Sequence, residues 1–545
     1  MALPDPPAAA ALPPPAPAPG VARLAASAGS ATMASRLLGL VREQVLAAIF
    51  GAGNAMDAFL VAFRIPNLVR DLFAEGAMSA AFVPTFTRHL TRQGRASAWR
   101  LANMVITALL LITGLVVVLG IVFARPLVTA FAADFALEPG KLELTVTLTR
   151  VMLPFLPLVA VAAATMGMLN SLHRFFIPAL SPAMFNVAII ACALVLVPLM
   201  PALGQPAIMA IAIGAVVGGV AQAALQWPSL RREGYRFRPA LDFRDEGLLR
   251  VLILMGPGTV GLAATQVNLF VNTVLATSEG TGAVSWLNYA FRLMYLPIGL
   301  FGVSIATAAL PSLSRDAARD QLAGMRQTIS AGLRLMLMLN VPAAIGLIVL
   351  ASPIVQLIFE RGRFTPDDTA ATAAALLFYA PGLIGYSTVK IAVPSFYSLH
   401  DARTPVVTSV ATVALAVVLN VVLVKAIGYR GLALGTAIAA LFNAVVLLWL
   451  LRKRLGGLDE SRLAIAFVKI LAAGTLMGAA AWGCEHYLRS AWPPAGPASQ
   501  AVQLFTAIAS GLVTLAVTAK TFRISEFDQA IQLVAARVAR TRPRG

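Results

Sequence analysis

Long apolar stretches recur along nearly the whole chain, with short polar connections between them. A stretch of about 20 apolar residues can cross the hydrocarbon core of a bilayer as a helix. The pattern predicts an all-α polytopic membrane protein with about 14 transmembrane helices. The predicted spans are 26–50, 56–86, 101–124, 146–169, 178–202, 206–228, 249–276, 283–311, 330–359, 368–395, 404–424, 429–452, 464–487 and 500–521.

The composition supports the membrane class. Of the 545 residues, 59% are hydrophobic and 12% are charged, whereas a soluble protein carries about 25% charged residues. Stretches such as 109–123 and 406–424 also lack the polar face that a helix on a soluble protein would show. The two cysteines, Cys192 and Cys484, lie far apart in apolar stretches, so we predict neither a disulfide framework nor a metal site.

The formal net charge is +18, which in a soluble protein would suggest a nucleic-acid partner. Here the arginines gather in alternate loops, as in the connection 229–248, and we predict no nucleic-acid binding. The opposite loops are poor in Lys and Arg, apart from Arg361 and Arg363. The positive-inside rule then places both termini in the cytoplasm.

The two chain ends are predicted to be cytoplasmic tails. Residues 1–25 begin with an Ala/Pro-rich stretch that lacks the basic region and apolar core of a cleavable signal peptide. We interpret them as a disordered tail. Residues 526–545 end in a group of arginines and are interpreted as a basic tail.

An internal repeat is visible in the sequence. One pair of related segments is AFRIPNLVRDLFAEGAMSAAFVPTFTR (62–88) and AFRLMYLPIGLFGVSIATAALPSLSR (290–315). A second pair is SLHRFFIP (171–178) and SLHDARTP (398–405). Paired halves are typical of transporters, which bind their cargo between the halves. A duplication that was kept only for stability is the alternative.

The repeat predicts a domain organisation with two pseudo-symmetric six-helix lobes and two additional helices. Because each half has an even number of spans, the halves are predicted to be parallel, related by an axis along the membrane normal. The predicted parts are an N-lobe at 26–228, a cytoplasmic linker at 229–248, a C-lobe at 249–455 and the last two helices at 456–525.

Several predicted spans contain charged residues, although ionisable groups are costly in the hydrocarbon core. Such groups usually face a cavity or one another, and an excess of arginine favours an anionic ligand because the guanidinium fork matches phosphate oxygens. The charged residues are Arg36, Arg42 and Glu43 in the first span, Asp57, Arg64, Arg70, Asp71 and Glu75 in the second, Arg292 in the eighth and Lys390 in the tenth. The polar residue Ser35 lies next to Arg36 and is considered with them.

Another interpretation of these cations stays open. Long basic side chains can extend to the membrane interface, which would give Arg36 or Lys390 no role in binding. A further expectation concerns Pro66, which predicts an interruption of the second span of the kind that lines transporter sites.

Three motifs carry a resemblance to a known family. They are SRLLGLVREQVLAAIFGAGNAMDAFLVAFRIPNLVRDLFAEGAMSAAFVPTFTR (35–88), VSWLNYAFRLMYLPIGLFGVSIATAALPSLS (284–314) and LNSLHRFFIPALSP (169–182). They resemble the MurJ/MviN family of lipid II flippases, within the multidrug/oligosaccharidyl-lipid/polysaccharide exporter superfamily. The sequence departs from the family at Phe291 and Tyr295, where the family often has acidic residues.

The resemblance implies roles for individual residues. It implies cargo-binding groups at Arg36, Arg42, Arg70, Arg292, Ser35 and Lys390. It implies gating or charge-balancing groups at Glu43, Asp57, Arg64 and Glu75, and a weak match to an ion ligand at Asp401. It implies no catalytic residue and no metal, and a polyprenyl tail lying in a groove of the last two helices.

The function that the resemblance implies is translocation of lipid II, the undecaprenyl-pyrophosphate-linked peptidoglycan precursor, by alternating access in the bacterial inner membrane. No cofactor is expected, and a monovalent cation or the membrane potential would supply the coupling. Membrane lipids and cell-wall synthesis proteins are the expected further partners. The alternatives are a drug or polysaccharide exporter, a lipid-dependent transferase and a scaffold for cell-wall enzymes.

Overall fold

The computed structural model describes residues 19–71, 78–493 and 496–532, and within these ranges the regular elements are all helical. The first half contains α1 (Pro19–Phe50), α2 (Asn54–Arg70), α3 (Met78–Arg92), α4 (Gly94–Val122), α5 (Ala124–Phe131), η2 (Ala133–Leu137), α6 (Lys141–Met152), α7 (Phe155–Ser171), α8 (Phe176–Leu196), η3 (Pro201–Leu203) and α9 (Met209–Arg232).

The second half begins with α10 and is followed by two additional helices. Its elements are α10 (Glu246–Thr277), α11 (Ala283–Pro297), the π-helical turn η4 (Ile298–Gly302), α12 (Val303–Ala318), α13 (Leu322–Val349), α14 (Ala351–Phe359), α15 (Pro366–Tyr379), α16 (Gly382–Ser398), α17 (Arg403–Ile427) and α18 (Tyr429–Leu455). The last two are α19 (Glu460–Ala491) and α20 (Pro497–Thr521).

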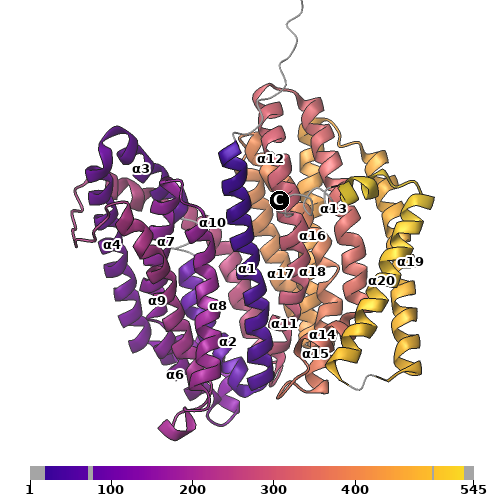
Figure 1. Ribbon diagram of the computed structural model, residues 1–545, viewed down its shortest axis with the longest axis horizontal. Coiled ribbons are helices and arrows are strands. Elements are labelled where there is room, and N and C mark those ends of the chain that lie inside the picture. The colour runs from indigo at the N-terminus through magenta and orange to yellow at the C-terminus, as the bar shows by residue number, and fades with distance from the viewer. Residues whose placement is uncertain (1–18, 72–77, 494–495, 533–545) are drawn as a thin grey trace, which may run out of the picture.

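The two halves use the same packing scheme. In the first half α8 packs against α9, α7 against α9 and α1 against α8; in the second half the corresponding pairs are α17 with α18, α16 with α18 and α10 with α17. Figure 1 shows the halves as two neighbouring groups of helices, with α19 and α20 at the outer edge of the second. The predicted all-α fold with two pseudo-symmetric lobes and two additional helices is confirmed.

The repeated SLH motif forms the same helix end in both halves. His173 and His400 have φ of 60° and 57°, in the left-handed region. In each case the next residue donates a backbone hydrogen bond over the turn, from Arg174 to Leu169 at 2.9 Å and from Asp401 to Phe396 at 3.0 Å. This is the pattern of a Schellman helix end.

The number of spans stays a prediction. Within the described residues, nine helices are long and apolar enough to cross a membrane, or ten if α15 and α16 form one bent span. The other four predicted spans coincide with α1, with α2 and α3, with α10, and with α11 and α12.

The predicted interruption of the helix at Pro66 is wrong. Helix α2 continues through Pro66 and ends at Arg70. A proline inside a membrane helix is tolerated where the surroundings satisfy the backbone groups that it frees.

The predicted linker 229–248 packs tightly against the first half. Tyr235 is buried, and its hydroxyl donates a hydrogen bond of 2.8 Å to Asn103 of α4. Helix α10 then begins against α3, where Leu248 and Val251 belong to the apolar cluster that also contains Tyr235. Helix α10 also packs against α17 of the second half. Helix α10 therefore contacts both halves.

An apolar groove lies between α13, α19 and α20. It encloses about 790 Å³, and its walls include Met338, Met477 and Leu515. Residues 525–532 form a further helix that contributes Phe527 and Ala530 to the groove, so the first residues of the predicted basic tail are packed helix. The Glu526 carboxylate of this helix pairs with Arg334 of α13 at 3.0 Å.

Candidate functional site

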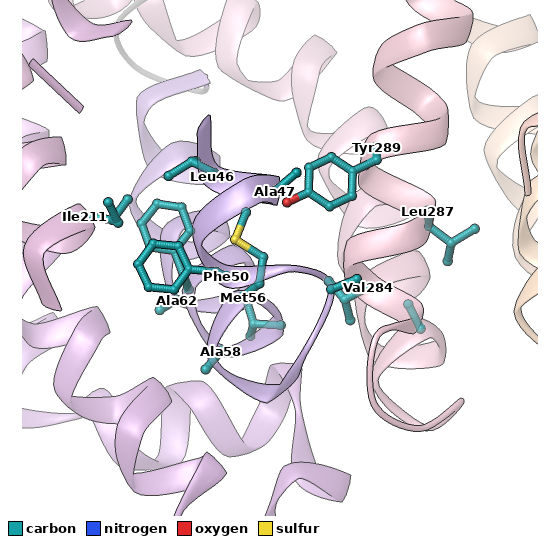
Figure 2. Packing of buried hydrophobic residues seen from close by; sticks show 14 of the residues in the cluster. Leu46, Ala47, Phe50, Met56, Ala58, Ala62, Ile211, Val284, Leu287 and Tyr289 are labelled. Carbon is teal, nitrogen blue, oxygen red and sulfur yellow. The ribbon is translucent and has the colours of Figure 1, made fainter. Parts of the chain in front are cut away.

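The two halves meet in an apolar core where α1 ends and α2 and α11 begin. Leu46, Met56 and Tyr289 are buried together there, as Figure 2 shows. The Tyr289 ring packs against Phe359 with 4.9 Å between ring centroids. We call this region, comprising residues 46–57 and 282–289, the closed end.

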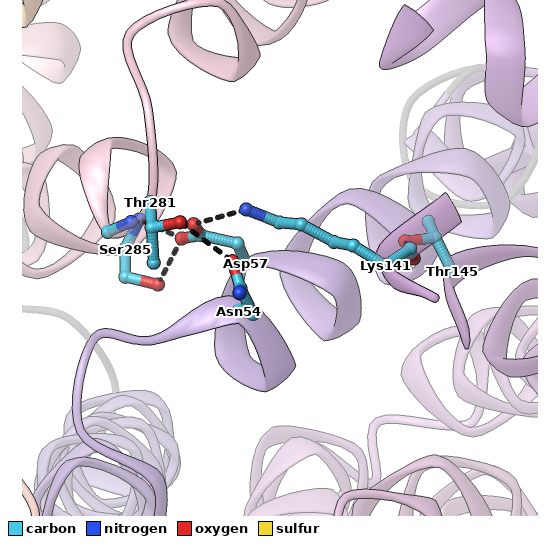
Figure 3. Close-up of polar contacts among 7 residues, drawn as sticks. Asn54, Asp57, Lys141, Thr145, Thr281 and Ser285 are labelled. Atoms are coloured by element: carbon cyan, nitrogen blue, oxygen red, sulfur yellow. Dashed lines mark hydrogen bonds and ion pairs between the residues drawn. The ribbon is translucent and has the colours of Figure 1, made fainter. Parts of the chain in front are cut away.

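A buried polar network joins the two halves inside the closed end (Figure 3). The fully buried Asp57 carboxylate of α2 accepts hydrogen bonds from the Gly282 N–H at 2.7 Å and from the Ser285 N–H at 3.1 Å. The Ser285 hydroxyl donates a third at 2.7 Å. The N–H groups at a helix start have no partner within the helix and favour a negative charge, so Asp57 caps α11 from the other half.

At the closed end, the backbone of the loop after α14 approaches the end of α1 so closely that two positions there accommodate only glycine. The Arg363 N–H donates a hydrogen bond of 2.9 Å to the carbonyl of Ala48 in α1. A side chain at Gly51 would collide with the Arg363 carbonyl, and one at Gly362 with the Ala48 carbonyl. The loop after α14 is therefore seated directly on the end of α1.

Next to the closed end, one carboxylate lies between arginines from both halves. Glu43 of α1 is 3% exposed and accepts from its neighbour Arg42. The Nε of Arg292, on α11 of the second half, lies 3.3 Å from the same carboxylate oxygen. The Arg292 side chain is still 52% exposed, so it faces open space as well as Glu43.

Arg36 contacts the second half one layer further along the same helices. Its guanidinium lies against Gly299 of η4, where an added Cβ would collide with it. Arg36 and Glu43 share a face of α1 because they are seven residues apart, and Arg292 and Gly299 have the same spacing. Helix α1 therefore touches the eighth predicted span in two layers.

Arg64 and Arg70, the cations of the second predicted span, lie close to Glu43 and Arg292. Arg70 forms an ion pair of 2.8 Å with Asp71, and both side chains are partly exposed. Arg64 and Arg70 each interact electrostatically with Arg292. The structure thus gathers four arginines, Arg42, Arg64, Arg70 and Arg292, around the two carboxylates of Glu43 and Asp71. We call this set the arginine site.

Three more predicted residues lie apart from the arginine site or outside the described residues. Ser35 is half-buried, and its carbonyl accepts a hydrogen bond from Asn186. Lys390 is exposed on α16 and forms no ion pair within the described part of the chain. Glu75 lies outside the described residues.

Asp401, the possible ion ligand, caps the start of α17. Its carboxylate accepts hydrogen bonds from the Thr404 N–H at 3.0 Å and the Thr404 hydroxyl at 2.8 Å. These bonds lower the pKa of Asp401 below its usual value. Among the described residues, no group of three or more His, Cys, Asp or Glu could hold a metal ion. An ion site at Asp401 stays a prediction.

The sequence reasoning missed the partners of Asp57. Ser285 carries no charge, and Lys141 lies in a predicted loop because the fourth span was placed at 146–169. The repeat held a signal for Ser285, because aligning the two AFR motifs sets Ser285 opposite Asp57. No comparable signal pointed to Lys141.

Comparison with known proteins identifies the family. Residues 46–496 match the sequence profile of the family described as Lipid II flippase MurJ. The chain belongs to the MurJ family. A relative named probable lipid II flippase MurJ, from Vibrio cholerae serotype O1, is 35% identical over 500 residues, which cover 89% of this chain and 92% of the relative. The Lipid II flippase MurJ of Burkholderia cenocepacia is 36% identical over 430 residues, covering 78% of this chain and 82% of the relative.

Solved structures agree with membership of the MurJ family. A lipid II flippase MurJ in an inward closed conformation matches with a TM-score of 0.75 and 25% identity, over 91% of this chain and 99% of its own. An inward-facing multidrug transporter of the MATE family matches with a TM-score of 0.64 and 16% identity, over 80% of this chain and 99% of its own. The second likeness shows a shared fold.

Proposed function

We propose that this chain is a transporter, not an enzyme, and that it moves lipid II from the inner to the outer leaflet of the bacterial cytoplasmic membrane. Membership of the MurJ family supports the cargo. The observation that carries the proposal is the arginine site, where Arg42 of one half and Arg292 of the other share Glu43. A cargo bound there would touch both halves.

The pyrophosphate of lipid II is the group that suits this site. Four arginines outnumber the two carboxylates near them, and the exposed side of Arg292 leaves hydrogen-bond donors for an anion. Guanidinium groups bind phosphate oxygens through paired hydrogen bonds. In this proposal Arg36, Arg42, Arg70 and Arg292 bind the pyrophosphate, and Ser35 and Lys390 contact the remaining headgroup.

The transport cycle that we propose is alternating access. With both termini in the cytoplasm, the closed end faces the outside, and the cargo enters from the cytoplasmic side. Release then requires the contacts of Asp57 with Gly282 and Ser285 to break. The membrane potential or a coupled monovalent cation would bias this step, since moving one charge through 100 mV is worth about 2.3 kcal/mol.

The lipid tail of the cargo is assigned to the groove beside α13. Its walls are almost wholly apolar, with Pro342, Gly346 and Leu512 among them. A polyprenyl chain can stay there while the headgroup crosses between the halves. Glu75 keeps its proposed gating role, and contacts with cell-wall synthesis proteins are proposed without an assigned surface.

The test is complementation in bacterial cells that are depleted of their own flippase. Lipid II exposed at the outer leaflet is measured after expression of the wild type, of Arg292→Ala and of Arg315→Ala. Arg315 is the matched control, because it is an exposed arginine in α12, just beyond the end of the same predicted span. We expect the wild type and Arg315→Ala to restore exposure, and Arg292→Ala to lower it by about tenfold or more.

Two results would contradict the proposal at different points. Full activity of Arg292→Ala would remove the arginine site from the mechanism. A wild type that reaches the membrane but restores no lipid II exposure would remove lipid II as the cargo, and the exporter alternative would then take its place.

A further inference from the structure

We propose that Lys141 is a positioning residue of the closed end, whose ammonium group stabilises the Asp57 carboxylate and thereby the closed state. This inference rests on the alternating-access part of the proposed function. It concerns the closing of the two halves and needs no particular cargo.

Lys141 is buried against Asp57. It is the first residue of α6, its side chain is 2% exposed, and its Nζ lies 3.2 Å from Oδ2 of Asp57. The ammonium also lies 4.1 Å from the centre of the Phe135 ring, which offers the negative face of its π system. The nearby Glu143 pairs with Arg125. Among the described contacts, Asp57 is therefore the carboxylate paired with Lys141.

The donors to Asp57 divide between the two halves. Three hydrogen bonds come from Gly282 and Ser285 at the start of α11, in the second half. The fourth contact comes from Lys141, in the first half, and α6 packs directly against α2. When the halves part, Asp57 loses the three bonds to α11 and keeps Lys141.

The closed state depends more strongly on Lys141 than the open state does. In the closed state Asp57 is 0% exposed, and an uncompensated buried charge is highly unfavourable. Backbone N–H groups at a helix start carry only partial charges, equivalent to about half a unit. In the open state water can hydrate the carboxylate. Removing the ammonium therefore shifts the equilibrium towards opening.

Disulfide trapping across the closed end measures this equilibrium. The Thr281 hydroxyl donates to Asn54 of the other half at 2.8 Å, so Asn54→Cys with Thr281→Cys reports closure. The free cysteines Cys192 and Cys484 are first changed to Ala. The full chain in lipid nanodiscs is oxidised, and the rate of cross-linking is compared between variants.

Lys141→Met is expected to lower the cross-linking rate by about tenfold, while Lys141→Arg keeps it close to that of the parent. Lys425→Met is the matched control, because Lys425 is an exposed lysine at the end of α17. Adding Asp57→Asn to Lys141→Met is expected to restore cross-linking, since the unpaired charge is then gone and an amide oxygen still accepts from α11.

Two results would overturn the proposal. One is a Lys141→Met variant that cross-links as fast as the parent. The other is a double variant that stays as slow as Lys141→Met, because a lost fold and not a lost charge would then explain the defect. Cross-linking needs no lipid II, so failure of the flipping assay would leave this test intact.

Discussion

Glu43 is the residue on which most of the contact between the halves near the arginine site depends. It is buried, and it neutralises Arg42 of its own helix and Arg292 of the other half at once. A phosphate oxygen has the same charge and accepts the same hydrogen bonds. Under the proposed function, the pyrophosphate of the cargo would replace Glu43 as the partner of Arg42 or Arg292.

Substitution of Gly299 tests whether transport depends on the position of the Arg36 side chain. Gly299→Ala would add a methyl group where the Arg36 guanidinium lies, and this flexible side chain would move aside. We expect a thermal midpoint within about 2 °C of the parent, because the displaced group is only the end of a side chain. Lipid II exposure in depleted cells should fall severalfold.

The control for this prediction is Gly114→Ala in α4, where an added Cβ meets nothing within 4 Å. It should keep both the midpoint and the activity. Unchanged activity of Gly299→Ala would show that Arg36 works equally well from a different position.

At the scale of elements, the repeat was predictable from the sequence because it preserves local structure. The SLH motifs recur because each half ends a helix with a histidine in the left-handed region. The apolar helices were also predictable, because hydropathy is a property of each segment by itself. The contact of Asp57 with Lys141 was not, because it joins α2 and α6, and neither the hydropathy nor the charge of one segment encodes a partner in another.

The helix ends at His173 and His400 give a prediction about stability. A β-branched residue is strained at positive φ, whereas glycine is not. His400→Val should lower the free energy of unfolding by about 1–2 kcal/mol relative to His400→Gly. The same pair of substitutions at His173 should differ by a similar amount, since its φ is 60° against 57° at His400.

Thermal unfolding of the purified variants, followed by intrinsic fluorescence, checks this expectation. If the Val and Gly variants at both positions unfolded at the same temperature, the left-handed turns would not contribute to the stability of the helix ends.

At the scale of the whole molecule, the groove and the second half are linked through α13. Helix α13 lines the groove with Met338 and packs against α12 and α16 of the second half. The family resemblance implied that the lipid tail of the cargo lies beside the last two helices, whereas the sequence pattern assigned residues 526–532 to a basic cytoplasmic tail. The reason is that Glu526 and Phe527 find their partners on α13 and not in their own short segment.

The ion pair between Arg334 and Glu526 holds the last described helix on the groove. Glu526→Lys should release residues 525–532, because it places two cations side by side. Labelling of Ala530→Cys by a maleimide should then become about tenfold faster, since Ala530 is buried. The native cysteines Cys192 and Cys484 are replaced by Ala for this measurement.

The charge-swapped variant Glu526→Lys with Arg334→Glu is the control and should return labelling to the slow rate. If both variants labelled at the rate of the parent, apolar packing of Phe527 alone would hold this helix in place.

The partnership of Glu43 with Arg292 has a consequence for the synthesis of the protein. At about 5–20 residues per second, Arg292 leaves the ribosome roughly 10–50 s after Glu43. During that interval Glu43 has only Arg42 as its partner, and charged residues oppose insertion of a helix. The insertion machinery therefore has to shield the early helices from lipid until α11 is inserted. Assembly of the arginine site is a late step in the biogenesis of this chain.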